Sequence, residues 1–358
     1  MTRPQTMKGM VLTGHGGPEK LVWREDLPVP DPGDGEVLIR VGASSVNNTD
    51  INTRIGWYSK SVRGDTASGT TGSYSEGADE DGGWAGNALS FPRVQGADCC
   101  GTIVAVGEGV APGRVGERIL ARTMQPRGDD PNDLQIVTLG SEMDGAFAEY
   151  VVISAADALT VRSDLSDVEL ASFPCAFSTA EGMIQRATLR AERVLITGAS
   201  GGVGSAAIQL AKRRGAHVTA LTSPAKAADL RAIGADETLD RDGDLPERAF
   251  DVVLDLVGGP RWEAVVATLR NGGRYVTSGA IAGPIVELDL RTLYLRDLTL
   301  IGSTHQPPRV FTDLVRYIEN GEIRPLLAKT YSLQELKVAQ EVFLSKSHIG
   351  KIGIQVAS

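Results

Sequence analysis

The chain has 358 residues, and its 36 lysines and arginines against 45 aspartates and glutamates give a formal net charge of −9. This length predicts two domains with a sizeable buried core, and ordinary shares of hydrophobic (42%) and charged (23%) residues exclude wholesale disorder. The acidic balance and the lack of a basic cluster argue against nucleic-acid binding, and no apolar run approaches the length of a membrane span. With three cysteines and no apolar leader, we expect a cytoplasmic protein.

From residue 7 to about 153 the chain shows short β-rich segments, such as 36–41 and 101–106, separated by turn signals. The pattern predicts an irregular, mostly β domain over residues 1–160. Residues 60–90 differ, because they are rich in Gly, Ser, Thr and Asp and nearly free of aliphatic side chains. Such an insertion is either a mobile surface loop or a lid over an active site.

Beyond residue 163, apolar strand patterns alternate with helical ones. Strands are expected at 193–197, 217–221, 252–257, 273–278 and 298–302, and helices at 203–214, 224–233 and 261–269. The alternation predicts a Rossmann-type, doubly wound parallel sheet over residues 161–306. Two helices (310–319 and 333–343) and a strand (352–356) follow, and residues 307–358 are expected to return to the β domain and complete it as a discontinuous unit.

A glycine-rich turn, Gly-Ala-Ser-Gly-Gly-Val-Gly from Gly198, follows the first of these strands and leads into an amphipathic helix. Gly201 lets the backbone approach a pyrophosphate, Gly204 lets the helix pack closely on the strand, and the helix start offers unpaired N–H groups. A turn that only joins strand to helix is the alternative. The expected contacts to a dinucleotide are Ala199, Ser200, Gly201, Gly202, Val203 and Gly204.

The end of the next strand distinguishes the two nicotinamide cofactors. An NAD site has an Asp or Glu about 20 residues after the turn, where it binds the ribose 2′-hydroxyl. Here the strand ends in Thr222 and Ser223, and no carboxylate precedes Asp229. These hydroxyls, with Lys226 and Arg241 as cations, favour the 2′-phosphate of NADP(H), although Lys226 by itself could equally be a solvated helix residue.

Four motifs together resemble the medium-chain dehydrogenase/reductase superfamily, and within it the zinc-independent quinone oxidoreductase and enone reductase branch. They are VNNTD at 46–50, GADCCGTIVAVG at 96–107, the glycine turn, and GAIAG at 279–283. The resemblance spans nearly the whole chain and implies a GroES-like catalytic domain, with the cofactor in the cleft between the domains. It also implies cofactor contacts from Gly279, Ala280, Ile281 and Lys351, the last of which is alternatively a surface lysine.

The resemblance also bears on metal binding. Zinc alcohol dehydrogenases of this superfamily have Cys where Asn47 stands, His and Glu where Ala97 and Asp98 stand, and a further Cys at the position of Cys175. Of the usual three ligands only Cys175 is retained, and alanine cannot bind a metal. We therefore expect no catalytic zinc.

Without a Lewis acid, reduction of a quinone or a conjugated C=C bond is less demanding than alcohol oxidation, because the substrate carbonyl delocalises the charge. Asn47 is the first candidate to donate to the developing enolate, and Thr179 matches a position that approaches the nicotinamide in the family. Asp50 is either an acid or a cap of the following turn. The side chains expected to line the substrate cleft are Arg54, Trp57 and Tyr58.

The sequence thus predicts an NADPH-dependent reductase of quinones or α,β-unsaturated carbonyl compounds. In the family, the edge strand that 296–302 would form pairs with its twin, which implies a homodimer. Two alternatives stay open: an alcohol dehydrogenase with an unusual metal site, and an NADPH-binding protein without turnover.

Overall fold

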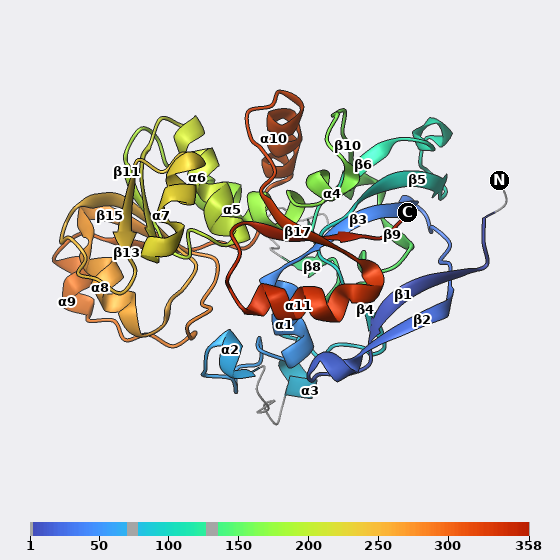
Figure 1. Ribbon diagram of the computed structural model, residues 1–358, viewed down its shortest axis with the longest axis horizontal. Helices are drawn as coiled ribbons and strands as arrows, with labels where there is room; N and C mark the ends of the chain where they lie inside the picture. Colours follow the sequence, from blue (N-terminus) through green and yellow to red (C-terminus); the bar gives the residue numbers. More distant parts are fainter. Residues whose placement is uncertain (1–2, 70–77, 127–134, 358) are drawn as a thin grey trace.

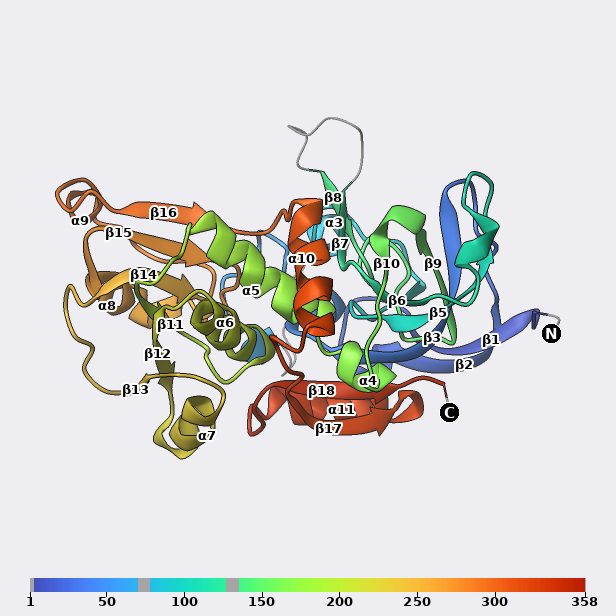
Figure 2. The ribbon, with the colours of Figure 1, turned by 90° about the horizontal axis from the view of Figure 1, so that it is seen from above.

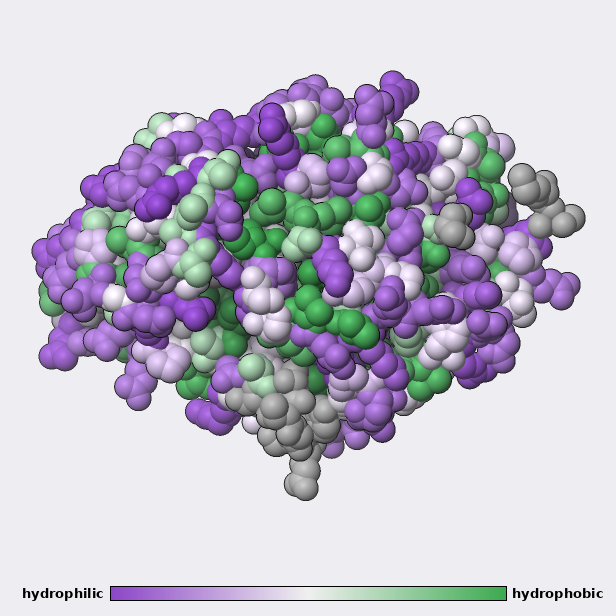
Figure 3. Space-filling model, viewed as in Figure 1, coloured by the Kyte–Doolittle hydropathy of each residue, from purple (hydrophilic) through white to green (hydrophobic). Residues whose placement is uncertain are grey.

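The computed structural model describes residues 3–69, 78–126 and 135–357. The chain forms two lobes side by side along the long axis, one drawn mainly in yellow and orange and the other in blue, teal and red (Figure 1). In the face shown in Figure 3, hydrophilic residues dominate both lobes and hydrophobic residues gather in the middle, between them. Within the described residues, no helix has the length and apolar character needed to cross a bilayer.

The first lobe is built on a parallel sheet with the strand order β13-β12-β11-β14-β15-β16, and every adjacent pair in it is parallel. The order reverses between β11 and β14, as expected for the predicted doubly wound sheet, which is confirmed. Its strands are β11 (Arg193–Ile196), β12 (His217–Thr222), β13 (Glu237–Asp240), β14 (Phe250–Asp255), β15 (Leu269–Thr277) and β16 (Thr299–Gly302).

The main helix of this lobe is α6 (Gly202–Arg213), which packs against α5 (Pro174–Arg186) and against β11 and β12. Its buried face carries small and apolar residues at helical spacing, including Ala206, Ala207, Leu210 and Ala211. Alanine on this face lets the helix approach the sheet closely. The other helices of the lobe are α7 (Ala227–Ala232), α8 (Trp262–Ala267) and α9 (Leu290–Tyr294).

The second lobe is β-rich, as predicted. Its largest sheet has the order β10-β6-β5-β3-β18-β17, with β9 also paired to β3. Smaller sheets are formed by β2-β1-β4 and by β7-β8. The strands are β1 (Thr6–Leu12), β2 (Leu21–Pro28), β3 (Glu36–Val46), β4 (Arg93–Val94), β5 (Cys100–Val106), β6 (Arg118–Ala121), β7 (Met124–Pro126), β8 (Ile136–Thr138), β9 (Tyr150–Ser154), β10 (Ala158–Thr160), β17 (Leu327–Ser332) and β18 (Lys351–Gln355).

The C-terminal part of the chain returns to this lobe. Strand β18 pairs antiparallel with β3, and helix α11 (Leu336–Leu344) packs with β17 and β18 (Figure 2). Helix α10 (Pro308–Glu319) instead packs on α5, and its Phe311 and Leu314 join the hydrophobic core of the parallel sheet. The chain therefore rejoins the β lobe at β17, somewhat after the boundary at 307.

The insertion at 60–90 contains two short helices, α2 (Thr66–Gly69) and α3 (Ala78–Asp81), and its residues 70–77 lie outside the described part of the chain. Thr66 donates its backbone N–H to the carbonyl oxygen of Ile281, 3.1 Å away in the other lobe. The start of the insertion therefore spans from the β lobe to the parallel-sheet lobe. The remaining helices are α1 (Asn48–Ile55) and α4 (Asp167–Leu170).

Candidate active site

The glycine turn lies where the order of the parallel sheet reverses. The chain leaves β11 through Gly198, whose φ of +57° favours glycine, and enters α6 at once. A Cβ on Gly204 would lie 2.3 Å from the carbonyl oxygen of Gly198, so this close packing requires glycine. Gly201 is the N-cap of α6 and accordingly marks the end at which the helix presents unpaired N–H groups. The structure thus gathers residues 199–204 into one turn suited to a diphosphate.

Lys226 lies beside this turn, and Arg241 lies close to Lys226. The Nζ atom of Lys226 is 3.5 Å from Ser200 Oγ, and the backbone N–H of Arg241 donates to the carbonyl of Thr222 at 2.9 Å. Ser223 begins the short turn that carries Lys226. Burial lowers the pKa of Lys226, and the charge of Arg241 lowers it further. The four residues expected at the 2′-phosphate are therefore neighbours at the end of β12.

Two further basic residues, which the sequence did not reveal, join this group from the C-terminal segment. Lys226 Nζ donates to the carbonyls of Lys346 (2.6 Å) and His348 (2.7 Å). Burial, and then repulsion from Lys226, lowers the pKa of Lys346 to about 8, while burial and the charge of Lys346 lower that of His348 to about 4. Within the described part of the chain, neither Lys226 nor Lys346 forms an ion pair with a carboxylate. This uncompensated positive charge would stabilise a bound anion.

The loop after β15 forms another part of the crevice. Ile281 donates its backbone N–H to the carbonyl of Leu256 at 3.5 Å, and an added Cβ on Gly279 would lie 3.3 Å from the same carbonyl oxygen. Gly279, Ala280 and Ile281 therefore lie against the loop that follows β14, on the side of the sheet where its strands end. This is the position that a dinucleotide occupies in an open α/β sheet.

Asp255, at the end of β14, is a functional candidate that the sequence analysis missed. Its buried carboxylate accepts hydrogen bonds from Thr197 Oγ1, from the Tyr275 hydroxyl and from the backbone N–H of Val257 and Gly258. It thereby joins three adjacent strands and the loop beside the glycine turn. An acidic residue that ends an apolar strand was the signal available in the sequence.

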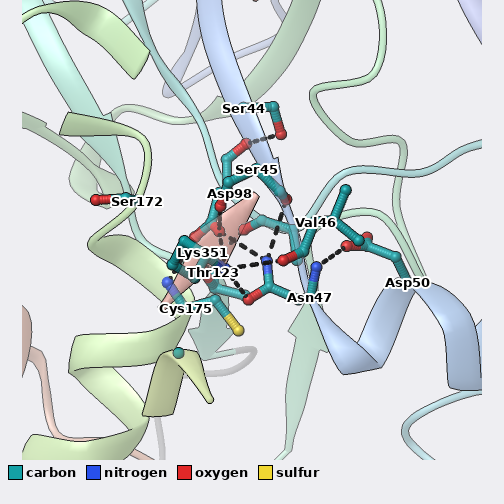
Figure 4. A network of polar contacts seen from close by, with 12 residues as sticks. Ser44, Ser45, Val46, Asn47, Asp50, Asp98, Thr123, Ser172, Cys175 and Lys351 are labelled. Atoms are coloured by element: carbon teal, nitrogen blue, oxygen red, sulfur yellow. Dashed lines mark hydrogen bonds and ion pairs between the residues drawn. The ribbon is translucent and has the colours of Figure 1, made fainter. Parts of the chain in front are cut away.

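A second cluster lies in the β lobe, where β3, β18 and the start of α5 meet (Figure 4). Asp98 is fully buried, and its Oδ2 atom lies 3.0 Å from the ammonium of Lys351, which is only 3% exposed. The carboxylate also accepts from Ser45 Oγ and from the backbone N–H of Cys175 at 2.7 Å. The Lys351 ammonium donates in addition to the carbonyl of Val46 and to Asn47 Oδ1. Every proton of the ammonium thus has an acceptor.

Asn47 has a different role from the one expected. Its Nδ2 donates to Asp98 Oδ2 at 2.7 Å and to the carbonyl of Ser45 at 3.3 Å, while its Oδ1 accepts from Lys351. The side chain of Asn47 is therefore committed to the buried network, and in this arrangement it does not offer an N–H group to a substrate. It positions its neighbours instead.

Asp50 caps a helix. Its Oδ2 accepts from the backbone N–H of Asn47 at 2.7 Å, which closes a capping box at the start of α1. Of the two interpretations left open for Asp50, the cap is the one seen in the structure. Burial raises the pKa of this carboxyl to about 7, against the hydrogen bond from Asn47, and the charge of Asp98 adds to the rise.

The prediction that Arg54 lines the cleft is wrong. Its guanidinium is fully buried in the β lobe, where it donates to the carbonyl of Gly16 at 2.7 Å and to Gln340 Oε1 at 3.1 Å. The sequence placed Arg54 beside Trp57 and Tyr58, but α1 ends between them at Gly56, which has φ +68°. The chain therefore turns, and Arg54 serves the packing of the lobe.

Trp57 and Tyr58, the other two residues expected to line the cleft, form an aromatic cluster with Trp84 from the insertion. The rings of Trp57 and Tyr58 meet edge to face with centroids 5.7 Å apart, and those of Tyr58 and Trp84 do so at 6.4 Å. Burial strongly raises the pKa of Tyr58. Side-chain hydrogen bonds with Thr49 and Asn52 lower this pKa in part, and electrostatic repulsion from Cys175 and Asp50 raises it further. The Tyr58 hydroxyl thus keeps its proton next to the network around Asp98.

Thr179 and Cys175 lie one helical turn apart on α5. Thr179 is close enough to lower the pKa of the Cys175 thiol, but burial and the charge of Asp98 outweigh it and raise that pKa well above its ordinary value. Both residues are more than nine-tenths buried at the junction of the two lobes. Thr179 therefore lies where the two lobes meet, which is the place expected for the cleft.

The residues at the zinc position of related enzymes do not fit a zinc ion. Ala97 has no ligand atom, and the Asn47 amide and the Asp98 carboxylate are already hydrogen-bonded. The Lys351 ammonium adds a positive charge in direct contact with both. Among the described residues, no group of three or more His, Cys, Asp or Glu side chains is arranged to hold a metal.

Comparisons with known proteins cover both lobes. Residues 33–163 match a family described as alcohol dehydrogenase GroES-like domain, and residues 202–320 match one described as zinc-binding dehydrogenase. The acryloyl-coenzyme A reductase of Metallosphaera sedula is 28% identical over 97% of this chain and 99% of its own length. The quinone oxidoreductase of Lama guanicoe is 27% identical over 95% of this chain and 94% of its own length.

One solved structure has a higher sequence identity to this chain than these two enzymes. A putative alcohol dehydrogenase from Sinorhizobium meliloti 1021 shares 46% sequence identity and superposes with a TM-score of 0.89, covering 99% of this chain and 97% of its own. The fold and its domain pairing are thus found in proteins whose names include both reductases of conjugated compounds and alcohol dehydrogenases.

The raised pKa of Asp50 predicts a pH-dependent contribution to stability. The unfolded carboxyl has a pKa of about 3.9, so between about pH 4 and pH 7 the folded state binds the proton more tightly and loses stability as the pH rises. Asp50→Asn removes this titration and keeps an oxygen for the Asn47 N–H. We expect the free energy of unfolding of the wild type, relative to the variant, to fall by about 1–4 kcal/mol across that range in urea titrations.

The exposed Asp34→Asn variant is the matched control and should follow the wild type at every pH. Parallel stability curves for the wild type and Asp50→Asn would show that Asp50 is ionised in the folded state throughout this range.

Proposed function

The chain belongs to the medium-chain dehydrogenase/reductase superfamily, and we propose that it is an NADP(H)-dependent reductase of α,β-unsaturated carbonyl compounds or quinones that works without zinc. One observation carries the proposal: the position that binds zinc in related alcohol dehydrogenases is filled by the hydrogen-bonded set of Asn47, Asp98 and Lys351. Relatives named acryloyl-coenzyme A reductase and quinone oxidoreductase support the substrate class.

The chemistry of a site without a metal favours conjugated substrates. Alcohol oxidation needs a cation or base that stabilises an alkoxide, whereas hydride addition to a conjugated C=C bond gives an enolate that neutral hydrogen-bond donors can stabilise. When bound, NADPH supplies the hydride. The protein has to hold both reactants in the cleft and donate hydrogen bonds to the carbonyl oxygen of the substrate.

Tyr58 and Thr49 are the donors that we assign to this oxygen. Burial keeps the Tyr58 phenol protonated, and the hydroxyl of Thr49 is buried beside it. The two hydroxyls therefore supply what Asn47 cannot, because the amide of Asn47 is already committed. Tyr58 is also a proton source for the enolate carbon.

The cofactor-binding residues fit NADP(H). Residues 199–204 would hold the diphosphate, and Gly279, Ala280 and Ile281 would contact the nicotinamide half. Lys226 lies in the turn that begins at Ser223 and contacts the carbonyl of Lys346, while Arg241, which pairs with Asp242, is close enough to lower the pKa of Lys226. A 2′-phosphate would supply Lys226 and Lys346 with a negative charge that the described residues do not provide. Thr179 approaches the cleft from α5, as it does in the family pattern.

A homodimer and a cytoplasmic location complete the proposal. Strand β16 is an edge of the parallel sheet, and near it the side chains of Leu290, Tyr294 and Leu295 are more than 60% exposed. Pairing of two such edges would cover both the unpaired backbone groups and the apolar side chains. The cysteines at 99, 100 and 175 are all buried and free, as suits a reducing compartment.

An alcohol dehydrogenase is the second candidate, because the structure with 46% identity is named as one. The two candidates differ in their dependence on metal. The glycine turn and the basic cluster would also suit a protein that binds NADPH without turnover. Such a protein would not need the hydroxyls of Thr49 and Tyr58 as hydrogen-bond donors to a substrate.

The proposed activity predicts oxidation of NADPH by conjugated substrates. The purified protein should consume NADPH, measured at 340 nm, with at least one of 2-cyclohexenone, acryloyl-coenzyme A and 1,4-benzoquinone, and excess 1,10-phenanthroline should leave the rate unchanged. Cyclohexanol with NADP⁺ serves as the control for the second candidate. If none of the three acceptors oxidises NADPH and the protein oxidises cyclohexanol in a metal-dependent reaction, the protein is an alcohol dehydrogenase instead.

Tyr58→Phe should lower kcat by about 100-fold with little change in KM for NADPH, because it removes one donor to the developing oxyanion and keeps the aromatic ring. Trp57→Phe is the control that leaves the phenol in place, and we expect less than about a tenfold loss from it. Equal small losses in the two variants would remove Tyr58 from the mechanism.

Lys226→Met should weaken NADPH binding by about 10- to 100-fold and leave NADH binding nearly unchanged, because only NADPH carries the phosphate that pairs with the ammonium. Calorimetric titration of both cofactors measures the difference. Lys329→Met, which removes an exposed lysine from β17, is the control. A similar loss for both cofactors would show that Lys226 does not recognise the phosphate.

A further inference from the structure

A short C-terminal segment connects the nucleotide site with the buried catalytic network. Residues 346–351, here called the strap, run from the end of α11 into the first residue of β18. The strap contacts the glycine turn at Gly350, and its last residue, Lys351, reaches into the cluster around Asp98.

On the nucleotide side, the strap is held by three kinds of contact. Lys226 Nζ donates to the carbonyls of Lys346 and His348. The backbone N–H of Gly350 donates to the carbonyl of Ser200 at 2.9 Å, so the strap and the glycine turn share a backbone hydrogen bond. The aliphatic stem of Lys351 passes over Gly202, where an added Cβ would lie 2.7 Å from Lys351 Cδ.

On the catalytic side, Lys351 has one available arrangement. Its ammonium is 3% exposed and donates to the carbonyl of Val46, to Asn47 Oδ1 and to Asp98 Oδ2. Moving it away would leave the Asp98 carboxylate buried without its cation, which is strongly unfavourable. Asn47 and Asp98 in turn hold the starts of α1 and α5 through the capping box and the Cys175 N–H.

The strap has little freedom between these two ends. Gly350 has φ +79°, and an added Cβ there would lie 2.2 Å from the carbonyl oxygen of Leu326. The next residue, Lys351, donates its own N–H to the same carbonyl at 2.8 Å. A displacement of the glycine turn or of Lys226 is therefore passed along the strap rather than absorbed by a flexible loop.

We propose that Lys351 is a positioning residue that couples occupancy of the nucleotide site to the arrangement of Asn47, Asp98 and the helix starts that they hold. This inference rests on the proposed function, because the nucleotide is taken to carry a 2′-phosphate and the kinetic test uses the proposed substrate. A phosphate offers Lys226 a stronger acceptor than two carbonyl oxygens, so its binding changes how the strap is held. Lys351 transmits that change to the residues that carry Thr49 and Tyr58.

Hydrogen–deuterium exchange measures the coupling without turnover. Adenosine 2′,5′-bisphosphate is the probe, because it carries the phosphorylated ribose but no nicotinamide and so occupies only the Lys226 side. In the wild type, binding should slow exchange both at 198–204 and at 44–50. In Lys351→Met, it should slow exchange at 198–204 alone, although calorimetry shows the bisphosphate still bound with a Kd within about threefold of the wild type.

Each other result of this experiment overturns the coupling. Slower exchange at 44–50 in both proteins would mean that the signal does not pass through Lys351, and no change at 44–50 in either would mean that no signal arrives. If NADPH binds but the bisphosphate does not, the 2′-phosphate is not recognised and the coupling fails with it. If neither binds, the proposed cofactor site itself is wrong, which distinguishes the two failures.

Kinetics separate positioning from folding. Lys351→Met should lower kcat with the conjugated substrate by about tenfold or more while KM for NADPH changes little. The double variant Asp98→Asn/Lys351→Met removes both buried charges and should regain thermal stability without regaining kcat. Recovery of kcat together with the melting temperature would reduce Lys351 to a structural role. Lys329→Met, on the neighbouring strand, should match the wild type in both measurements.

Discussion

The buried ion pair of Lys351 and Asp98 is the interaction on which the rest of the site depends. Two charges removed from water are costly, and here the cost is offset because every proton of the ammonium and both oxygens of the carboxylate have partners. The pair joins β3, β18 and α5, three elements far apart in the sequence. Removing either partner should cost about 3–5 kcal/mol of stability, since it leaves an uncompensated charge in the interior.

The fold places this pair next to the nucleotide crevice. The reversal of strand order between β11 and β14 opens the crevice, Gly204 lets α6 pack against the turn, and β18 brings Lys351 to its edge. Lys226 contacts the glycine turn at Ser200, and the aliphatic stem of Lys351 contacts it at Gly202. The return of the C-terminal segment to the β lobe therefore matters for the site, because this segment contacts both Lys226 and Asp98.

Sequence patterns predicted the features that depend on residues close together in the chain. The glycine turn, the alternating strands and helices, and the basic end of β12 all depend on residues close together in the chain, and each was found where expected. The capping box at Asp50 is equally local. Arg54 was misplaced because a single left-handed residue, Gly56, redirects the chain after α1, and neighbours in sequence then face different surroundings.

Long-range pairing is what the sequence could not reveal. Nothing near Asp98 shows that its partner lies at Lys351, and the inward orientation of the Asn47 amide follows only from that partnership. The same holds for Lys346 and His348, whose place beside Lys226 depends on the return of the chain. A buried acid and a buried lysine, each set among apolar strand residues, were nevertheless a hint that the two charges belong together.

An ammonium held by Asp98 and Asn47 stands where the family resemblance places a metal in zinc alcohol dehydrogenases. The most direct test is the zinc content of the protein, measured by inductively coupled plasma mass spectrometry after incubation with excess zinc and extensive dialysis. If Lys351 takes the place of the metal, we expect a content far below one zinc per chain in a protein that still reduces its substrate. One tightly held zinc per chain, whose removal abolishes turnover and whose return restores it, would show that the enzyme depends on a metal.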